Sequence, residues 1–147
     1  MLIKSRKFVL LLACFVLVSA ATALDVPALS GRVNDQANIL SDASRERITT
    51  TLQQLEKEKG AQVAVLTIKS LHGESLEDYS ILVAEAWKLG RKDIDDGVLL
   101  LVAKDDRKIR IEVGYGLEGV LTDLDSRRII DNIMVPAFRT GDFAGGI

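Results

Sequence analysis

Cysteine, histidine and proline are scarce in this sequence, and the scarcity of the first two excludes several kinds of chemistry. The chain of 147 residues has one cysteine, one histidine and two prolines. Because Cys14 lies in an apolar N-terminal segment, the rest of the chain has no disulfide, no cysteine metal ligand and no thiolate nucleophile. His72 precedes Gly73 in an expected loop, and no pattern pairs it with a serine, so a Ser/His/Asp triad is not expected.

Positive charge and aromatic side chains are also in short supply. Aromatic residues make up 5% of the chain, and 19 Lys+Arg face 21 Asp+Glu. Three of the basic residues, Lys4, Arg6 and Lys7, lie in the first 23 residues, so residues 24–147 carry a formal charge of −5. Without a basic stripe to neutralise phosphates or a platform of aromatic rings, the chain is not expected to bind nucleic acid.

The N-terminus has the three parts of a secretory signal peptide, which we place at residues 1–23. A basic start to Lys7 precedes an uninterrupted apolar stretch, Phe8 to Val18, and a small-x-small site ends at Ala23. This order predicts export to the periplasm or cell surface, with a mature chain that begins at Leu24. An uncleaved membrane anchor and lipidation at Cys14 are the alternatives.

Downstream of an extended lead-in over residues 24–40, to which we assign no strand, helical and strand patterns alternate. Helices are expected over 42–59, from 76 toward 90, and from 122 until Pro136 kinks or ends the last one. Strands are expected over 63–68, 98–103 and 108–113. These elements predict a single domain over 41–147. Its fold would be a layered α/β/α sandwich whose small mixed sheet contains a parallel βαβ crossover and an antiparallel hairpin.

The expected hairpin brings acidic residues together at the end away from its turn. If the turn is centred on Asp105 and Asp106, residue 103 pairs with 108, and Asp96 comes opposite Tyr115. Carboxylate oxygens brought together in this way are suitable ligands for Ca²⁺, or less favourably for Mg²⁺. Carboxylates are, however, also common in turns and helix caps without any metal. We expect the unbound carboxylates to repel one another. The predicted metal ligands are Asp95, Asp96, Glu118 and Asp123.

Two further features receive structural interpretations. Residues Gly114 to Gly119 contain G-x-G-x-x-G, but they follow the half-polar strand of a hairpin and not the first strand of a βαβ unit. Nucleotide binding by this motif is therefore not expected. Trp87 lies on the apolar face of its helix and is assigned to the core.

From residue 32 to 147 the sequence resembles a TPM domain. The resemblance depends on Asp95-Asp96-Gly97, on the Gly114–Gly119 loop, on Thr122-Asp123 and on the ending Arg139-Thr140-Gly141-Asp142-Phe143-Ala144-Gly145-Gly146, which occur in the family's order. It implies an exported α/β sandwich, often tethered by a C-terminal transmembrane helix, with calcium bound in some bacterial members. The family's acidic positions match Asp95, Asp96, Glu118, Asp123 and also Asp35. Family members begin a further helix where this chain ends, at Ile147, so the resemblance implies a truncated C-terminus.

Two functional hypotheses follow from the resemblance and from the acidic cluster. The favoured hypothesis is an exported, cation-binding interaction module that acts at or near a membrane-protein complex. The alternative is a metal-dependent acid-phosphatase-like hydrolase, an activity associated with plant relatives of the family. The residues suit cation binding better than turnover, because no evident nucleophile accompanies the carboxylates.

Overall fold

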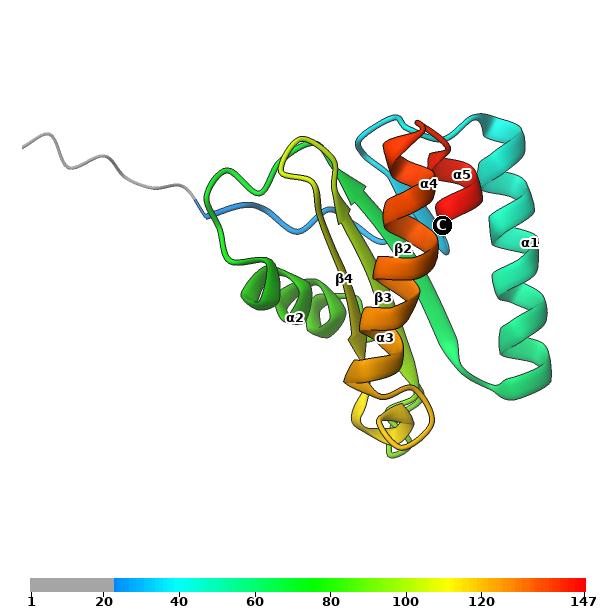
Figure 1. Cartoon of the computed structure of the whole chain (residues 1–147). Coiled ribbons are helices and arrows are strands. Elements are labelled where there is room, and N and C mark those ends of the chain that lie inside the picture. Colours follow the sequence, from blue (N-terminus) through cyan, green and yellow to red (C-terminus); the bar gives the residue numbers. More distant parts are fainter. Residues whose placement is uncertain (1–22) are drawn as a thin grey trace, which may run out of the picture.

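The computed structural model describes residues 23–147, which form an α/β sandwich around one four-stranded sheet (Figure 1). The predicted signal peptide, with the lipidation alternative at Cys14, therefore lies almost wholly outside the described residues. The strand order is β1-β2-β3-β4; β1, β2 and β3 run parallel and β4 is antiparallel. The strands are β1 (Val33–Asp35), β2 (Gln62–Ile68), β3 (Gly97–Ala103) and β4 (Lys108–Val113).

Helices cover both faces of the sheet, as the fold prediction required. On one face lies α2, and on the other lie α1 and the C-terminal helices (Figure 1). The helices are α1 (Asp42–Lys59), α2 (Leu76–Ala86), the 3₁₀ helix η1 (Tyr115–Leu117), α3 (Asp123–Ile129), the π-helix η2 (Ile130–Met134), α4 (Val135–Arg139) and α5 (Phe143–Gly146). Within residues 23–147, none of these is long and apolar enough to cross a membrane.

The central strand β3 divides the core into two layers, because its side chains alternate between the faces. Leu99 and Leu101 pack with Val83 and Trp87 on the side of α2, which confirms Trp87 as a core residue. Leu100 and Val102 pack on the opposite side, with Met134 of η2 and the inner residues of α1. Every residue of β3 is buried, as its continuous apolar run predicts for a strand covered on both faces.

The lead-in contains a strand that the sequence pattern did not reveal. Within it, β1 pairs with β2, and the chain before it lies against α2. The Tyr79 hydroxyl donates to the Asp25 carbonyl at 3.0 Å, and Trp87 Nε1 donates to the Pro27 carbonyl at 2.7 Å. Residues 24–35 therefore belong to the folded domain.

Pro136 does not end the C-terminal helical segment, which runs through it from Asp123 to Arg139. It lies in the first turn of α4, directly after the π-helix η2. Proline has no N–H, so Pro136 cannot donate the α-helical hydrogen bond to the carbonyl four residues earlier. The wider π-helical turn η2 lies at the place where this bond is missing. The helical path thus continues to Arg139, with Phe138 directed at the sheet-facing core.

The β3–β4 hairpin has the predicted register. Ala103 pairs with Lys108 and Val98 with Val113, and the Gly114 N–H donates to the Gly97 carbonyl at 2.7 Å. The segment before β3 is thereby placed beside the segment after β4.

Candidate functional site

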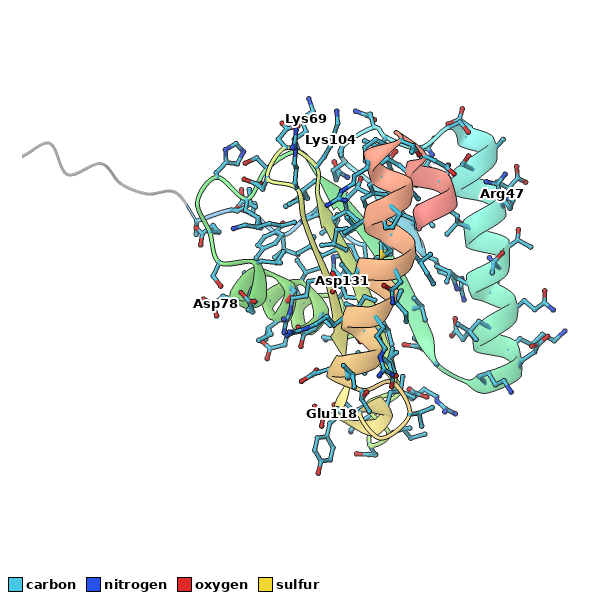
Figure 2. The ribbon with its side chains drawn as sticks, in the orientation of Figure 1. Arg47, Lys69, Asp78, Lys104, Glu118 and Asp131 are labelled. Carbon is cyan, nitrogen blue, oxygen red and sulfur yellow. The ribbon has the colours of Figure 1, made fainter. Side chains whose placement is uncertain are left out.

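The predicted metal ligands lie at one end of the sheet, where β3 begins and β4 ends. Asp95 and Asp96 directly precede β3, Glu118 follows η1, and Asp123 opens α3. We call these four carboxylates, with the loops that hold them, the acidic rim. In Figure 2, Glu118 marks this end of the molecule, and Lys69 and Lys104 mark the opposite end.

Asp96 is the buried member of the acidic rim, and its charge is already compensated. Its side chain is 4% exposed, and Arg91 binds it with three donors. The Arg91 backbone N–H donates to Oδ1 at 2.8 Å, and Nε and Nη2 donate to Oδ2 at 2.7 and 2.5 Å. The Arg91 side chain thereby holds the pKa of Asp96 below its ordinary value. The positive charge of Arg91 thus offsets the charge of Asp96, which reduces the repulsion expected between Asp96 and the other carboxylates of the rim.

The Asp95 carboxylate is also used within the protein. Asp95 has φ of 54° and Asp93 has φ of 70°, which are uncommon values for residues other than glycine. In this conformation Asp95 Oδ2 accepts the Tyr115 N–H at 2.9 Å, and its carbonyl accepts the Gly116 N–H at 3.0 Å. The loop before β3 is thus fastened to the loop after β4.

The glycines after β4 allow these two loops to touch. A Cβ on Gly116 would overlap the Ile94 carbonyl oxygen, and a Cβ on Gly114 would overlap the Asp95 carbonyl oxygen. Gly119, by contrast, has nothing within 4 Å of its Cβ position. The first two glycines of G-x-G-x-x-G therefore serve close backbone packing.

Glu118 and Asp123 are exposed, in contrast to Asp96. Asp123 stands in the first turn of α3, where a negative charge suits the helix dipole. The neighbouring Thr122 and Asp125 form a capping box at the start of α3, in which each side chain accepts from the other's backbone N–H. The hydroxyl of Thr122 also lowers the pKa of Asp125.

Residues 23–147 contain no group of three or more His, Cys, Asp or Glu side chains arranged to hold one metal ion. The pairing prediction did bring Asp95 and Asp96 beside Tyr115 and Gly116, but both carboxylates bind protein donors there. In this arrangement Asp95 and Asp96 accept protein donors, while Glu118 and Asp123 stay exposed.

Exposed apolar side chains are interspersed with the acids of the rim. Tyr115 is 80% exposed and Val120 81% exposed, and Leu124 and Ile94 are about half exposed. Next to Tyr115 lies an open groove of about 250 Å³ between α2 and β4, whose lining includes the acids Glu85, Asp95 and Glu112. We call it the rim groove.

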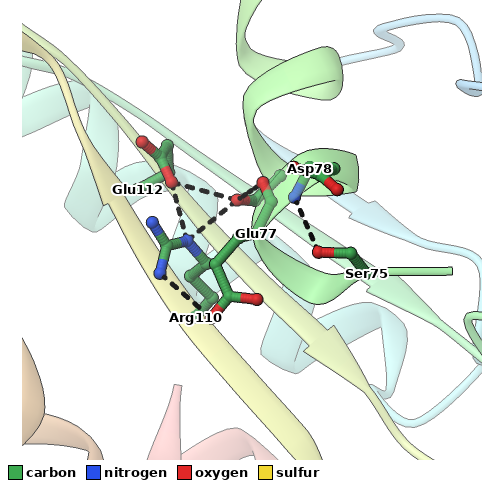
Figure 3. A network of polar contacts seen from close by, with 6 residues as sticks. Ser75, Glu77, Asp78, Arg110 and Glu112 are labelled. Carbon is green, nitrogen blue, oxygen red and sulfur yellow. Dashed lines mark hydrogen bonds and ion pairs between the residues drawn. The ribbon is translucent and has the colours of Figure 1, made fainter.

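Glu112 of the rim groove belongs to a polar network between α2 and β4 (Figure 3). Arg110 Nε donates to Glu112 Oε2 at 2.7 Å and to the fully buried Ser80 hydroxyl at 3.0 Å. The same hydroxyl lies 3.0 Å from Glu112 Oε2, and Arg110 Nη1 lies 3.7 Å from Glu77 Oε1. The network joins α2 to β4 through paired charges and sets the position of Glu112.

Asp35 does not belong to the acidic rim. It ends β1, at the carboxyl end of the parallel strands, whereas Asp95 and Asp96 precede the amino end of β3. Its carboxylate accepts the Leu40 N–H at 2.8 Å and the Thr67 hydroxyl. Asp35 therefore has a local role in the turn that leads into α1.

Sequence reasoning did not identify Arg91 or Tyr115 as members of this site. In the sequence, Arg91 stands five positions before Asp96, which is the spacing of the pair that they form. Contact between them depends on a loop that turns back through residues at positive φ. Tyr115 was noted only as a strand partner, since exposure of one aromatic side chain has no sequence signature.

Comparisons with known proteins agree with this architecture. The solution structure of the N-terminal domain of a P. gingivalis protein is similar over 83% of this chain and 81% of that one, with 38% identity and a TM-score of 0.75. Two further solution structures share the fold. The N-terminal domain of the cg2496 protein from Corynebacterium glutamicum has 18% identity, coverage of 85% and 81%, and a TM-score of 0.63. The BA42 protein from Bizionia argentinensis has 21% identity, coverage of 73% and 72%, and a TM-score of 0.62.

A comparison with curated proteins gave no match. The family model of the TPM domain matches residues 33–147, from the first residue of β1 to the end of the chain. With most of its length in that match, this chain belongs to the TPM domain family.

Proposed function

We propose that this protein is an exported interaction module that binds a partner at or near a membrane-protein complex through the acidic rim. The observation that carries the proposal is the exposure of Tyr115 and Val120, each about four-fifths exposed, beside an anchored acidic loop. Tyrosine contributes a large contact area at low entropic cost, and tyrosine is enriched at protein interfaces.

The contacts that hold the loops of the acidic rim in place favour the binding of a partner. The Arg91–Asp96 pair, the Asp95 contacts and the closely packed glycines hold the two loops of the rim before any partner arrives. A surface that is already ordered loses less conformational entropy on binding. This arrangement supports recognition by a rigid edge.

The proposal includes a cation that is bound by the exposed carboxylates of the acidic rim. Because Asp96 is bound to Arg91, the oxygens offered to Ca²⁺, or less favourably Mg²⁺, are those of Asp95, Glu118 and Asp123. Calcium accepts water and backbone carbonyls alongside carboxylates, so few protein ligands suffice for weak binding. Side-chain movement at Glu118 and Asp123 is required, and both are exposed.

A calcium titration followed by amide NMR tests the cation. We expect shifts at residues 94–96 and 115–123 with a dissociation constant on the order of 10⁻⁵ to 10⁻³ M, the range of weak extracellular sites. Glu118→Gln should weaken this binding, and Asp131→Asn, an exposed acid on η2, should leave it intact (Figure 2). An unchanged titration in Glu118→Gln would remove the cation from the proposal.

Photo-crosslinking in cells tests the interaction itself. A photoreactive amino acid at position 120 should give a discrete adduct in the membrane fraction, which Tyr115→Ser should reduce. The same group at position 47, exposed on α1, should give no such adduct (Figure 2). Equal labelling from both positions, or none from position 120, would refute a partner at the rim.

The alternative hydrolase makes a different prediction with p-nitrophenyl phosphate. It requires turnover that depends on a divalent metal and is lost in Glu118→Gln. Asp96→Asn is a poor test of it, since removal of the partner of Arg91 also disturbs the fold. Purified folded protein without such turnover leaves the interaction module as the function.

Export is tested separately. We expect N-terminal sequencing of the protein from the periplasm or cell surface to begin at Leu24. Met1 at the N-terminus would indicate an uncleaved anchor, and lipidated Cys14 would indicate a lipoprotein.

A further inference from the structure

We propose that a second site, at the opposite end of the sheet, binds a small organic anion: a phosphate or carboxylate group carried on an apolar body. The site is an open cavity of about 700 Å³ between the turn of the β3–β4 hairpin and helices α4 and α5. Cavities that hold small molecules have volumes of this order. We call it the basic cavity.

The lining of the basic cavity is rich in positive charge. The lining of the basic cavity contains four basic side chains and one acid, Asp105. The basic side chains are Lys104, Arg107 and Lys108 of the hairpin and Arg139 of α4. Within residues 23–147, none of these four takes part in an ion pair, whereas Arg32, Arg45, Arg91, Arg110 and Arg128 all do.

The second acid of the hairpin turn does not neutralise the cavity by direct contact. The carboxylate of Asp106 accepts the Leu71 N–H at 2.7 Å and lies 3.3 Å from the Ser70 hydroxyl. It is thus bound to the loop that follows β2, and its negative charge also attracts Lys108 of the lining. The cavity lining therefore has an excess of positive charge. Residues 24–147 as a whole carry a net charge of −5, so this end of the sheet differs from the rest of the chain.

The floor of the cavity is apolar, which distinguishes it from a site for a bare ion. Phe138, Phe143, Val135 and Ile109 line it together with the end of β3. The rings of Phe138 and Phe143 lie 5.0 Å apart between centroids, tilted by 51°, so they form one aromatic wall. Inorganic phosphate would leave this wall in water, whereas an anion with an apolar body would cover it.

The position in the fold supports the same conclusion. The parallel strands β1, β2 and β3 all end on this side, and β3 runs directly into the turn that supplies three of the basic side chains. Open α/β sheets bind ligands preferentially outside the carboxyl ends of their strands. The acidic rim lies at the other end, so the two sites are independent.

The test uses phenylphosphonate, a phosphate analogue that a hydrolase cannot cleave. Inorganic phosphate and benzyl alcohol serve as the bare anion and the neutral analogue. With the exported protein, amide NMR should show phenylphosphonate shifting residues 103–109 and 135–143 with a dissociation constant on the order of 1 mM, as expected for a ligand of about ten heavy atoms. Inorganic phosphate and benzyl alcohol should each bind at least about tenfold more weakly.

Variants locate the site. Arg107→Asn removes one charge and retains a residue that tolerates the positive φ of 54° found there. Arg139→Gln removes another from α4. Each should weaken phenylphosphonate binding about tenfold, the loss of one charge-assisted hydrogen bond. Arg47→Gln, which removes one charge from the exposed side of α1, should change it less than twofold.

Three results would overturn the proposal. The first is an absence of shifts around the cavity, and the second is an equal loss in Arg47→Gln. The third is binding to vesicles that contain phosphatidylglycerol, but not to phenylphosphonate, which would make this end a membrane-facing surface. Because phenylphosphonate is not a substrate, neither success nor failure here depends on the function of the acidic rim.

Discussion

Gly116→Ala tests whether the loops of the acidic rim are held by direct backbone contact. The new Cβ would lie 3.0 Å from the Asp95 carbonyl oxygen and far inside contact distance of the Ile94 carbonyl oxygen. The Ile94 carbonyl is main chain, so no side-chain rotation relieves the overlap. Both Ile94 and Asp95 donate their N–H groups to the Arg91 carbonyl, at 3.1 and 2.9 Å, so the whole turn must move.

The expected magnitude is at the upper part of the range for overpacking, about 2 to 3 kcal/mol in the free energy of unfolding. For a domain of this size, that loss lowers the melting temperature by roughly 6 to 15 °C. Urea denaturation should show a lower midpoint with an unchanged slope, because the surface exposed on unfolding is nearly the same. The contact between the Gly116 N–H and the Asp95 carbonyl, at 3.0 Å, should be lost with it.

Gly119→Ala is the matched control in the same loop. Its Cβ meets nothing within 4 Å, and its backbone is not in the positive-φ region. Alanine there should leave the free energy of unfolding unchanged or raise it by up to about 1 kcal/mol, because it restricts the unfolded chain. Equal destabilisation by both substitutions, or none by Gly116→Ala, would refute the close packing of the two loops.

Three further predictions concern other parts of the fold. Asp96→Asn and Arg91→Gln should both destabilise the protein at pH 7. Because the pKa of Asp96 is lowered in the folded state, this contribution is present above the ordinary pKa of aspartate and is lost as the pH falls through the folded value. Urea melts at pH 7 and pH 3 should therefore show a smaller deficit at pH 3. Leu99→Ala should cost about 2 to 5 kcal/mol, since Leu99 is fully buried, and a loss below 1 kcal/mol in a urea melt would contradict this core assignment. Thr122→Ala should cost about 0.5 to 2 kcal/mol through loss of the α3 cap, with Thr50→Ala on the exposed side of α1 as the control.

The parts of the fold with strong sequence periodicity were predictable. The first helix has a cap at Ser41 and a left-handed glycine stop at Gly60, and it spans the predicted residues 42–59. The continuous apolar run of β3 and the alternation of β4 identified a hairpin whose register follows from its turn. Local signals decided these elements, and the tertiary structure agreed with them.

β1 was not predictable in the same way. It has three residues, and its central residue Asn34 is polar yet 2% exposed. The Asn34 side chain is satisfied by the Ser30 N–H at 2.9 Å and the Gly31 carbonyl at 2.7 Å, which lie within the same loop. A strand this short is formed by pairing with β2, and pairing of distant segments leaves no periodic trace.

The candidate site was predictable in position but not in chemistry. Strand pairing correctly placed Asp95 and Asp96 beside Tyr115, since register is a matter of counting. The bond between Arg91 and Asp96 depends instead on the course of the loop between them, which includes two aspartates at positive φ. The basic cavity depends on Arg139 meeting a hairpin from a distant part of the chain, which no local pattern encodes.

The π-helix η2 has a consequence for changes in the length of this protein. A π-turn contains more residues than an α-turn, so the extra residue is accommodated within residues 130–134. Deletion of the exposed Asn132 would let this turn become α-helical, with Phe138 and Arg139 still facing the sheet and the hairpin. The same deletion inside α1 would rotate every later side chain of that helix by about 100° and take Leu52 off the sheet. The segment before Pro136 is thus the place in the C-terminal helices where the chain can lose one residue and keep its core.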